Sequence, residues 1–200
     1  MNLGSEIEFI SKSFIGETFE EDICNCLFEN CNFKFAKFSD ITISNCVFRN
    51  CSFLSANFSD VTIDKCDMSA SSFMNAALLD TKLIECKASG CDFTKIKQMG
   101  LEISGGNFSL SNFADNDFRF MKFSNIKFDS ASFFGCRLEK TTFKDCSMIG
   151  VDLNGANLTD ADIRGSKVDG VSFKNVNLKN CKADIAQAVC IAESMGCSIE

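Results

Sequence analysis

The hydrophobic positions of this chain repeat every five residues. From Ile23 to Ala183 the central position of each group of five is apolar, and Gln98 is the one polar exception among 33 consecutive positions. The residue two places before each centre is usually small, as at Cys26 and Ala36. An α-helix repeats every 3.6 residues and a β-strand every two, so neither element produces this pattern. A short fixed period indicates a solenoid, in which each unit buries its apolar side by stacking on its neighbours.

The repeated segments include SANFS, SGCDF, GANLT and DADIR. With them the chain resembles the pentapeptide-repeat proteins, whose pattern is A(D/N)LXX. The resemblance implies an all-β solenoid, a right-handed quadrilateral β-helix in which four pentapeptides make one coil. Residues 23–183 then form about eight coils, or eight to nine with the preceding segment. At about 4.8 Å between stacked strands, the rod is on the order of 40 Å long.

A coil of four pentapeptides predicts that every fourth central residue stacks in one column along the rod. One side holds a ladder of six phenylalanines in the structural core: Phe33, Phe53, Phe73, Phe93, Phe113 and Phe133. Gln98 lies in the next column, where it faces Ala88 across one coil, and a small residue opposite a longer one conserves volume.

The segment around Gln98, KIKQMGLEISGG, is the least regular part of the predicted barrel. A buried glutamine needs hydrogen-bond partners for its amide. We predict Gln98 as a core residue with two interpretations. It is either a satisfied core amide or local bulge, or an irregularity that re-aims the neighbouring surface.

Both ends of the chain depart from the barrel pattern. Phe9, Phe14 and Phe19 also repeat every five residues, but one position out of phase with the barrel. We therefore predict three segments: a capping coil in shifted register over residues 1–22, a continuous β-helix over 23–183, and a C-terminal helix and tail over 184–200. The predicted helix has one apolar face, which either caps the core or pairs with a second copy. That face comprises Ile185, Ala188, Val189, Ala192 and Met195.

The 13 cysteines could indicate a metal or disulfide site, but their phase favours a structural role. Ten occupy the small inward position, where cysteine packs as a small hydrophobic residue. The chain has no histidine, and the spacings do not favour zinc. Stacked cysteines one coil apart are close enough for a disulfide in principle. We expect structural thiols, no metal and no cofactor. The ten inward cysteines are Cys26, Cys31, Cys46, Cys51, Cys66, Cys86, Cys91, Cys136, Cys146 and Cys181.

Catalytic and targeting signals are absent from the sequence. Without histidine there is no His-based triad or general base, and there is no P-loop, dinucleotide fingerprint or HExxH motif. Serine and aspartate fall on outward positions, where solvation accounts for them. We therefore expect a binding surface and not an enzyme. No signal peptide or long apolar run is present, and many unpaired thiols fit a reducing compartment, so we expect a cytoplasmic protein without membrane contact.

The net charge of −7 is distributed unevenly. Residues 1–22 carry −5, residues 184–200 carry −3, and the barrel, with 18 acidic and 19 basic residues, carries +1. A uniformly acidic rod that imitates DNA by charge density alone is therefore not expected. One local column of carboxylates, Asp40, Asp60 and Asp80, is either a partner-binding feature or an ordinary solvated edge.

Outward apolar residues form a second candidate surface. They mark either a partner interface or tight local packing. Phe35, Leu54, Met74 and Phe134 are predicted on one side, and Leu79, Met99 and Phe120 on the next.

Nearly the full length resembles the Qnr (quinolone-resistance) family of pentapeptide-repeat proteins. The best segments are CDMSASSFMNAALLDTKLIECKASGCDF (66–93), DLNGANLTDADIRGSKVDGVSF (152–173) and MGCSI (195–199). The shifted N-terminal coil and the C-terminal helix add to the resemblance. Many Qnr proteins have loops extruded from the barrel, whereas this chain resembles the loop-free relatives.

The resemblance implies a homodimer, joined head to head, that binds DNA gyrase and topoisomerase IV. It also implies protection of these type II topoisomerases from quinolones, with partial mimicry of duplex DNA in some members and no direct binding of nucleic acid. The helix face becomes the expected dimer interface. The alternative is a scaffold protein with another partner, or an immunity protein against a different gyrase poison.

Overall fold

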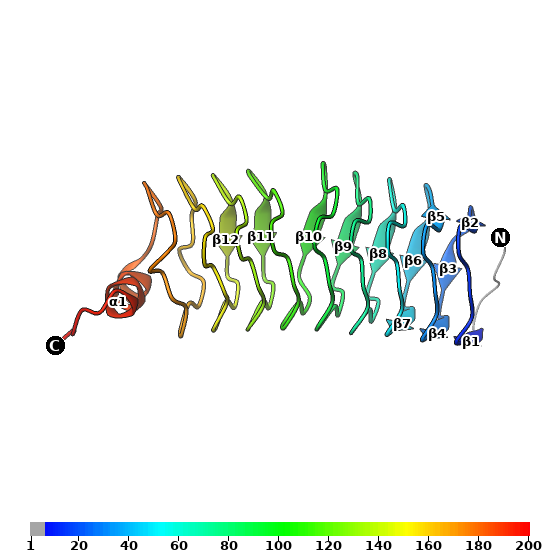
Figure 1. Ribbon diagram of the computed structural model, residues 1–200, viewed down its shortest axis with the longest axis horizontal. Coiled ribbons are helices and arrows are strands. Elements are labelled where there is room, and N and C mark those ends of the chain that lie inside the picture. Colours follow the sequence, from blue (N-terminus) through cyan, green and yellow to red (C-terminus); the bar gives the residue numbers. More distant parts are fainter. Residues whose placement is uncertain (1–6) are drawn as a thin grey trace.

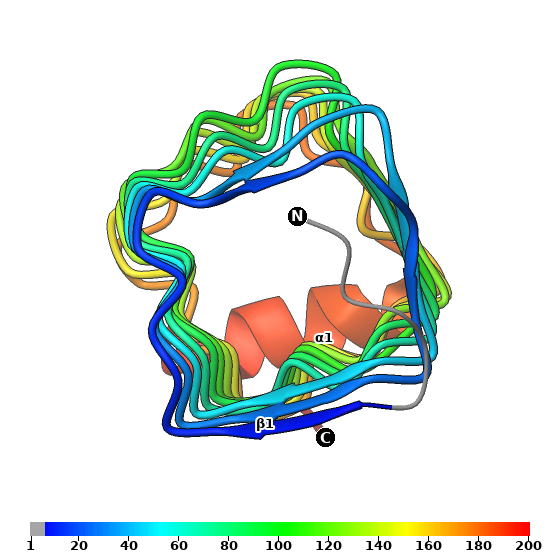
Figure 2. The ribbon, with the colours of Figure 1, turned by 90° about the vertical axis from the view of Figure 1, so that its right-hand side faces the viewer.

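The protein is an elongated solenoid with a helix at its C-terminal end (Figure 1). The computed structural model describes residues 7–200. Viewed along the rod, successive coils follow the same four-sided path, and α1 (Ile185–Ser194) lies across the end (Figure 2). The predicted parallel β-solenoid of pentapeptide repeats with a short C-terminal helix is confirmed.

The strands are two or three residues long and pair only in parallel. The longest sheet has seven strands in the order β12-β11-β10-β9-β8-β6-β3, one from each coil. Its register advances by four pentapeptides per strand, as where Ile43 pairs with Ile63. The smaller sheets are β1-β4-β7 and β2-β5. The strands are β1 (Glu8–Ile10), β2 (Thr18–Phe19), β3 (Ile23–Cys24), β4 (Leu27–Glu29), β5 (Lys37–Phe38), β6 (Thr42–Ser44), β7 (Val47–Arg49), β8 (Thr62–Asp64), β9 (Lys82–Ile84), β10 (Glu102–Ser104), β11 (Lys122–Ser124) and β12 (Thr142–Lys144).

Seven coils thus contribute a strand to the main sheet, slightly fewer than the eight predicted. Beyond β12 the same column continues through single bridges from Thr142 to Asp162 and from Asp162 to Lys182. The winding therefore persists to the helix, although the last coils lack extended strands.

The corners of the coils are left-handed turns. The residue two places after nearly every centre has a positive φ, and most of these residues are asparagine, aspartate or glycine, which tolerate that conformation. Three bulky exceptions, Phe35, Leu110 and Phe120, have φ values of 61°, 62° and 66°. Bulky side chains are uncommon there, so these corners are strained and their side chains project into solvent.

The predicted phenylalanine ladder is confirmed as the spine of the core. Successive rings from Phe33 to Phe133 stack with centroids 4.8–5.0 Å apart, and Phe14 adds a further ring at 4.8 Å from Phe33. All of these side chains are buried. Offset stacking of aromatic rings adds to the free energy gained from their burial.

The first coil stacks in register although its sequence is out of phase. Phe9 pairs with Phe28, a spacing one position shorter than in the barrel, and the rings of Phe19 and Phe38 stack at 4.6 Å. The first coil is one residue shorter than the others. The missing residue falls at its last corner, between Phe19 and Ile23. Residues 1–6 of the predicted capping coil lie outside the described residues.

The C-terminal helix is fixed to the last coils by polar contacts. Asp184 caps its N-terminus in a capping box with Gln187. The buried Gln187 amide donates to the carbonyl oxygens of Ile163 and Ser166, and Phe173 N donates to Ser194 Oγ at 3.2 Å. One of the two expectations for the apolar face of the helix was that it covers this edge of the barrel, but a different face covers it. The face that does so is centred on Gln187 and Ser194, because their polar groups satisfy the backbone exposed there.

The cysteine thiols are packed as the repeat phase predicted. Nine of the ten inward cysteines are buried, Cys181 is partly exposed, and all thirteen are free thiols. The Cys46 thiol lies 3.5 Å from the Ile23 carbonyl oxygen of the preceding coil. Burial raises the pKa of the Cys91 and Cys136 thiols to about 12.

Thiol reactivity is expected to follow this burial. At about pH 8 a thiol-alkylating reagent should modify the exposed Cys197 quickly, because reaction requires an accessible thiolate. Cys91 and Cys136 should react only after denaturation, with peptide mass spectrometry as the measurement. Rapid modification of Cys91 in the native protein would contradict the inward placement of the cysteine column.

Candidate functional site

The hydrogen-bonded stack of coils opens on one side between residues 95–104 and 115–124. In the preceding coil, Leu78 N donates to Lys97 O at 2.7 Å. The equivalent bond from Gln98 N to Asp117 O is missing from the described part of the chain. Figure 1 shows the wider gap between β10 and β11.

The opening has clear limits along the coil. At one end Ile96 N donates to Asn116 Oδ1 at 3.1 Å, and at the other Gly105 N donates to Ser124 O at 3.2 Å. Five backbone amides in this interval lack the hydrogen bond to the adjacent coil that the equivalent amides of neighbouring coils make within residues 7–200. They are the amides of Lys95, Gln98, Gly100, Asp117 and Lys122. β10 and β11 retain a single bridge, whereas β10 and β9 pair over three residues.

Bulky residues at the inner corners explain the opening. The small column reads alanine at positions 36, 56 and 76 and then changes to Ile96 and Asn116. At the next corner Leu101 stacks towards Met121. These side chains do not fit the normal coil spacing, so they hold the coils apart. The adjacent side stays closed, since the rings of Phe93 and Phe113 remain 5.0 Å apart. The opening is therefore a wedge.

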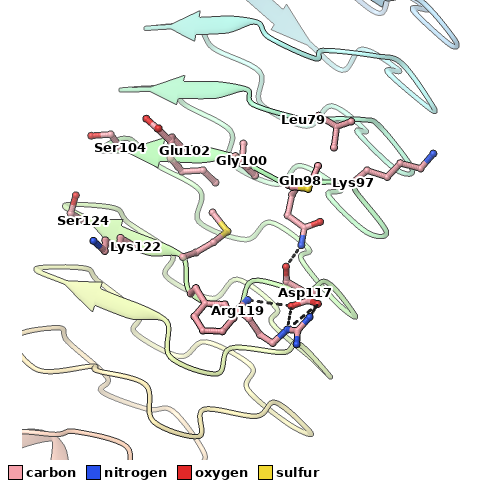
Figure 3. A pocket seen from close by; sticks show the side chains of 15 residues that line it. Leu79, Lys97, Gln98, Gly100, Glu102, Ser104, Asp117, Arg119, Lys122 and Ser124 are labelled. Atoms are coloured by element: carbon pink, nitrogen blue, oxygen red, sulfur yellow. Dashed lines mark hydrogen bonds and ion pairs between the residues drawn. The ribbon is translucent and has the colours of Figure 1, made fainter.

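Gln98 belongs to this wedge and not to the core. The structure leaves it partly exposed, which corrects the prediction of a buried core residue. Its side-chain Nε2 donates to the carbonyl oxygen of Asp117 (Figure 3). In a closed coil, the backbone N–H of Gln98 would donate to this oxygen. The side-chain amide is thus hydrogen-bonded within a local opening of the coil, and a role in re-aiming the neighbouring surface stays a prediction.

The wedge forms a cleft of about 970 Å³ with mixed walls. Leu79, Leu101 and Met121 contribute apolar surface, while Met99 and Phe120 are 75% and 64% exposed. Its charged residues are Lys97, Glu102, Asp117, Arg119 and Lys122.

One carboxylate in the cleft is held by two guanidinium groups. Asp117 Oδ2 lies 2.7 Å from Arg119 and 3.1 Å from Arg137. The hydrogen bond from Arg119 holds the pKa of Asp117 below its ordinary value. Next to this cluster, Lys140 Nζ lies 5.4 Å above the ring of Phe120, a cation–π geometry that fixes the strained corner.

The predicted acidic column leads directly to the cleft. Asp40, Asp60 and Asp80 are exposed and occupy the turn position of successive coils. The column continues with Gly100 at the upper edge of the cleft and Phe120 at the lower. Gly100 has a φ of 75°, and a Cβ there would lie 2.0 Å from Asp80 Oδ1, so both the backbone conformation and the position of this side chain favour glycine.

The second group of predicted surface residues does not form one stripe. Phe35, Met74 and Phe134 are exposed and Leu54 is partly buried. Thr94 and Ala114 occupy the two coils between Met74 and Phe134, so the apolar surface is interrupted.

The predicted dimer face of the helix points away from the barrel. Ile185 is 85% exposed and Met195 53% exposed, Ala188 is exposed, and Val189 and Ala192 are partly exposed. This leaves an apolar surface of the kind that a second copy could cover, and dimerisation through it stays a prediction.

The cleft residues Met99, Gly100, Arg119 and Met121 were not combined into a site by sequence reasoning. The signal that could have found them is the substitution of alanine by Ile96 and Asn116 in the small column. Among the described residues, no helix is long and apolar enough to cross a membrane.

The family comparison covers most of the barrel. The sequence matches the pentapeptide repeats (8 copies) over residues 26–69 and the pentapeptide repeat region over residues 103–173. Together these matches span more than half of the chain. No curated protein matches it.

Solved structures of QnrB1, a plasmid-mediated fluoroquinolone resistance protein, match nearly the whole chain. One trypsin-treated variant is 25% identical, with 98% of this chain and 100% of its own covered and a TM-score of 0.67. A second is 24% identical over 98% of both chains, also with a TM-score of 0.67. Full-length QnrB1 is 23% identical over 95% of this chain and 100% of its own, with a TM-score of 0.55. The chain therefore belongs to the pentapeptide-repeat proteins, and its structure is similar to that of QnrB1.

Proposed function

We propose that the protein binds the type II topoisomerases DNA gyrase and topoisomerase IV and protects them from quinolones. The carrying observation is the match to QnrB1, a fluoroquinolone resistance protein, over 98% of this chain at 25% identity. The resemblance of the sequence to the Qnr family supports the identity of the partner. The protein acts by binding and not by catalysis.

The acidic column gives this proposal a physical basis. Successive coils place Asp40, Asp60 and Asp80 about 4.8 Å apart along one corner. No ion-pair partner for any of the three occurs among residues 7–200. Regularly spaced carboxylates can imitate part of a phosphate backbone, so this corner is suited to a basic groove that otherwise holds DNA. Nucleic acid itself is not bound.

A supercoiling assay with purified gyrase tests the proposed function. In the presence of ciprofloxacin, added protein should restore supercoiling, and direct binding should be detectable without the drug. If the protein neither restores nor alters supercoiling, the proposed function is wrong. The alternative, an immunity protein against another gyrase poison, predicts protection from that poison and none from ciprofloxacin.

Replacing Asp40, Asp60 and Asp80 by asparagine is expected to weaken gyrase binding and to flatten its dependence on salt. The reason is that three charges facing a basic groove are lost while the exposed turn positions accept asparagine. Affinity measured across a series of salt concentrations gives the result.

A matched control replaces three exposed aspartates outside this column: Asp115, Asp145 and Asp169. This control changes the net charge equally and should bind like the wild type. Equal binding of both triple variants at low salt would assign the acidic column to ordinary solvation.

A further inference from the structure

We propose that the cleft between residues 95–104 and 115–124 accepts an extended acidic peptide segment of a partner protein as an added strand. This goes beyond the proposed function, because it does not depend on the partner being a topoisomerase. Three features of the cleft define the occupant: the unpaired backbone groups, the replaceable hydrogen bond of the Gln98 side chain, and the charge.

The two walls of the cleft offer complementary rows of backbone groups. In the closed coils, most amides on this side donate to a carbonyl of the next or the preceding coil, as do Leu78 N, Asp80 N and Lys82 N. Across the cleft, Gln98 N and Gly100 N on one wall, and Asp117 N and Lys122 N on the other, have no such acceptor in the described structure. The carbonyls of Ile96, Leu101 and Arg119 correspondingly lack the donors that their equivalents have. Backbone groups of this kind pair with a strand, since every extended peptide offers the same alternating donors and acceptors.

The side chain of Gln98 makes a hydrogen bond that the backbone of an incoming strand can make in its place. The Gln98 side-chain amide donates to the carbonyl oxygen of Asp117, so this acceptor on the opposite wall is already satisfied. A peptide N–H can take over this bond, because a primary amide and a backbone amide are equivalent donors. The Gln98 side chain is then free to turn towards solvent, to which it is already partly open.

The charge of the walls favours an acidic segment. Lys97, Arg119 and Lys122 face Glu102 and Asp117, which gives the lining +1 in a protein of −7. Asp117 is already neutralised by its two arginine partners. The exposed charges without an ion pair among the described lining residues are therefore Lys97 and Lys122 against Glu102, an excess of one positive charge.

Apolar side chains of the segment have surfaces to contact as well. Met99 and Phe120, both largely exposed, lie at the corner where the cleft opens to solvent. An extended chain alternates its side chains between two directions, so a sequence that alternates acidic and β-branched residues satisfies both kinds of wall. A peptide of about seven residues, at about 3.3 Å each, spans the interval when it bends once beside the corner formed by Gly100 and Phe120.

The test uses an end-blocked heptapeptide in which valine and glutamate alternate. We expect it to bind the full-length protein and to slow hydrogen exchange at the amides of residues 98–101 and 117–122. The same peptide with alternate backbone nitrogens methylated should not bind, because methylation removes the donors. A peptide with lysine in place of glutamate should bind at least about tenfold more weakly.

Paired charge reversals identify the site on the protein. Lys97→Glu with Lys122→Glu should weaken binding of the glutamate peptide at least about tenfold. The matched control, Lys65→Glu with Lys144→Glu, changes two exposed lysines elsewhere and should leave binding unchanged.

Three results would overturn the proposal. They are no binding of the glutamate peptide at about 1 mM, equal binding of the methylated peptide, and protection from exchange confined to another part of the rod. The ciprofloxacin supercoiling assay is scored separately. If the peptide binds but gyrase is not protected, the proposed function is wrong and the peptide site stands. If gyrase is protected but the peptide does not bind, only the peptide site is wrong.

Discussion

Replacing Phe113 by alanine is expected to lower the free energy of unfolding by about 3–5 kcal/mol. Phe113 is 1% exposed and stacks between Phe93 and Phe133, each at 5.0 Å. It also makes an edge contact with Phe118 at 5.9 Å. Alanine would leave a cavity in the middle of the ladder. On this side the neighbouring coils are fixed by the backbone bonds from Phe93 N to Asn112 O and from Phe113 N to Ser132 O, so they cannot close around it. Denaturant unfolding followed by circular dichroism measures the loss.

The matched control is Phe134→Ala, one residue after the ladder position Phe133. Its side chain is 45% exposed, so its removal should cost less than about 1 kcal/mol. A loss below about 1 kcal/mol for Phe113→Ala would contradict the assignment of inward and outward positions.

Replacing Val189 by aspartate is expected to convert a dimer into a monomer and to abolish topoisomerase binding. In the structure Val189 belongs to the helix face that points away from the barrel, so the single chain can solvate the new carboxylate and stay folded. In a two-fold pair of helices the same carboxylate would be buried without a partner, which is strongly unfavourable. Light scattering gives the molecular mass, and circular dichroism reports the fold.

Leu110→Asp is the matched control for this variant. Leu110 is 67% exposed at a corner of the barrel, and aspartate tolerates its positive φ well. This variant should remain dimeric. A wild-type monomer, or a Val189→Asp variant that still dimerises, would reject the helix as the dimer interface.

The fold was predictable because its information is local and repeated. A side chain at every fifth position, such as Phe53 or Phe113, can be buried in one way only, and the stacking of every fourth pentapeptide follows once the coil is four-sided. The shifted register of Phe9, Phe14 and Phe19 was visible too. How the backbone of the first coil closes its last corner with one residue fewer could not be predicted, because it depends on backbone geometry and not on the pattern of side chains.

The cleft was only partly predictable, because it arises from volume and not from polarity. The polar Gln98 marked the segment, but the repeat alone implied that its side chain points inward. What separates the coils is the size of Ile96, Asn116, Leu101 and Met121 at neighbouring corners, and their combined effect depends on how the coils stack. The helix face presented a similar difficulty. Its apolar residues were correctly grouped, yet Gln187 anchors the opposite face through bonds to carbonyls that the sequence does not reveal.

The open ladder also affects how the rod responds to unfolding conditions. In a stacked array each coil is stabilised by its two neighbours, and cooperativity passes from coil to coil through those contacts. Between residues 95–104 and 115–124 the backbone bonds are reduced on one side, and the stacked rings of Phe93 and Phe113 remain on the adjacent side. This boundary therefore has the weakest nearest-neighbour coupling in the middle of the rod. We therefore expect the N-terminal and C-terminal halves to behave as two cooperative units, with the coils beside the boundary opening more readily than the other interior coils.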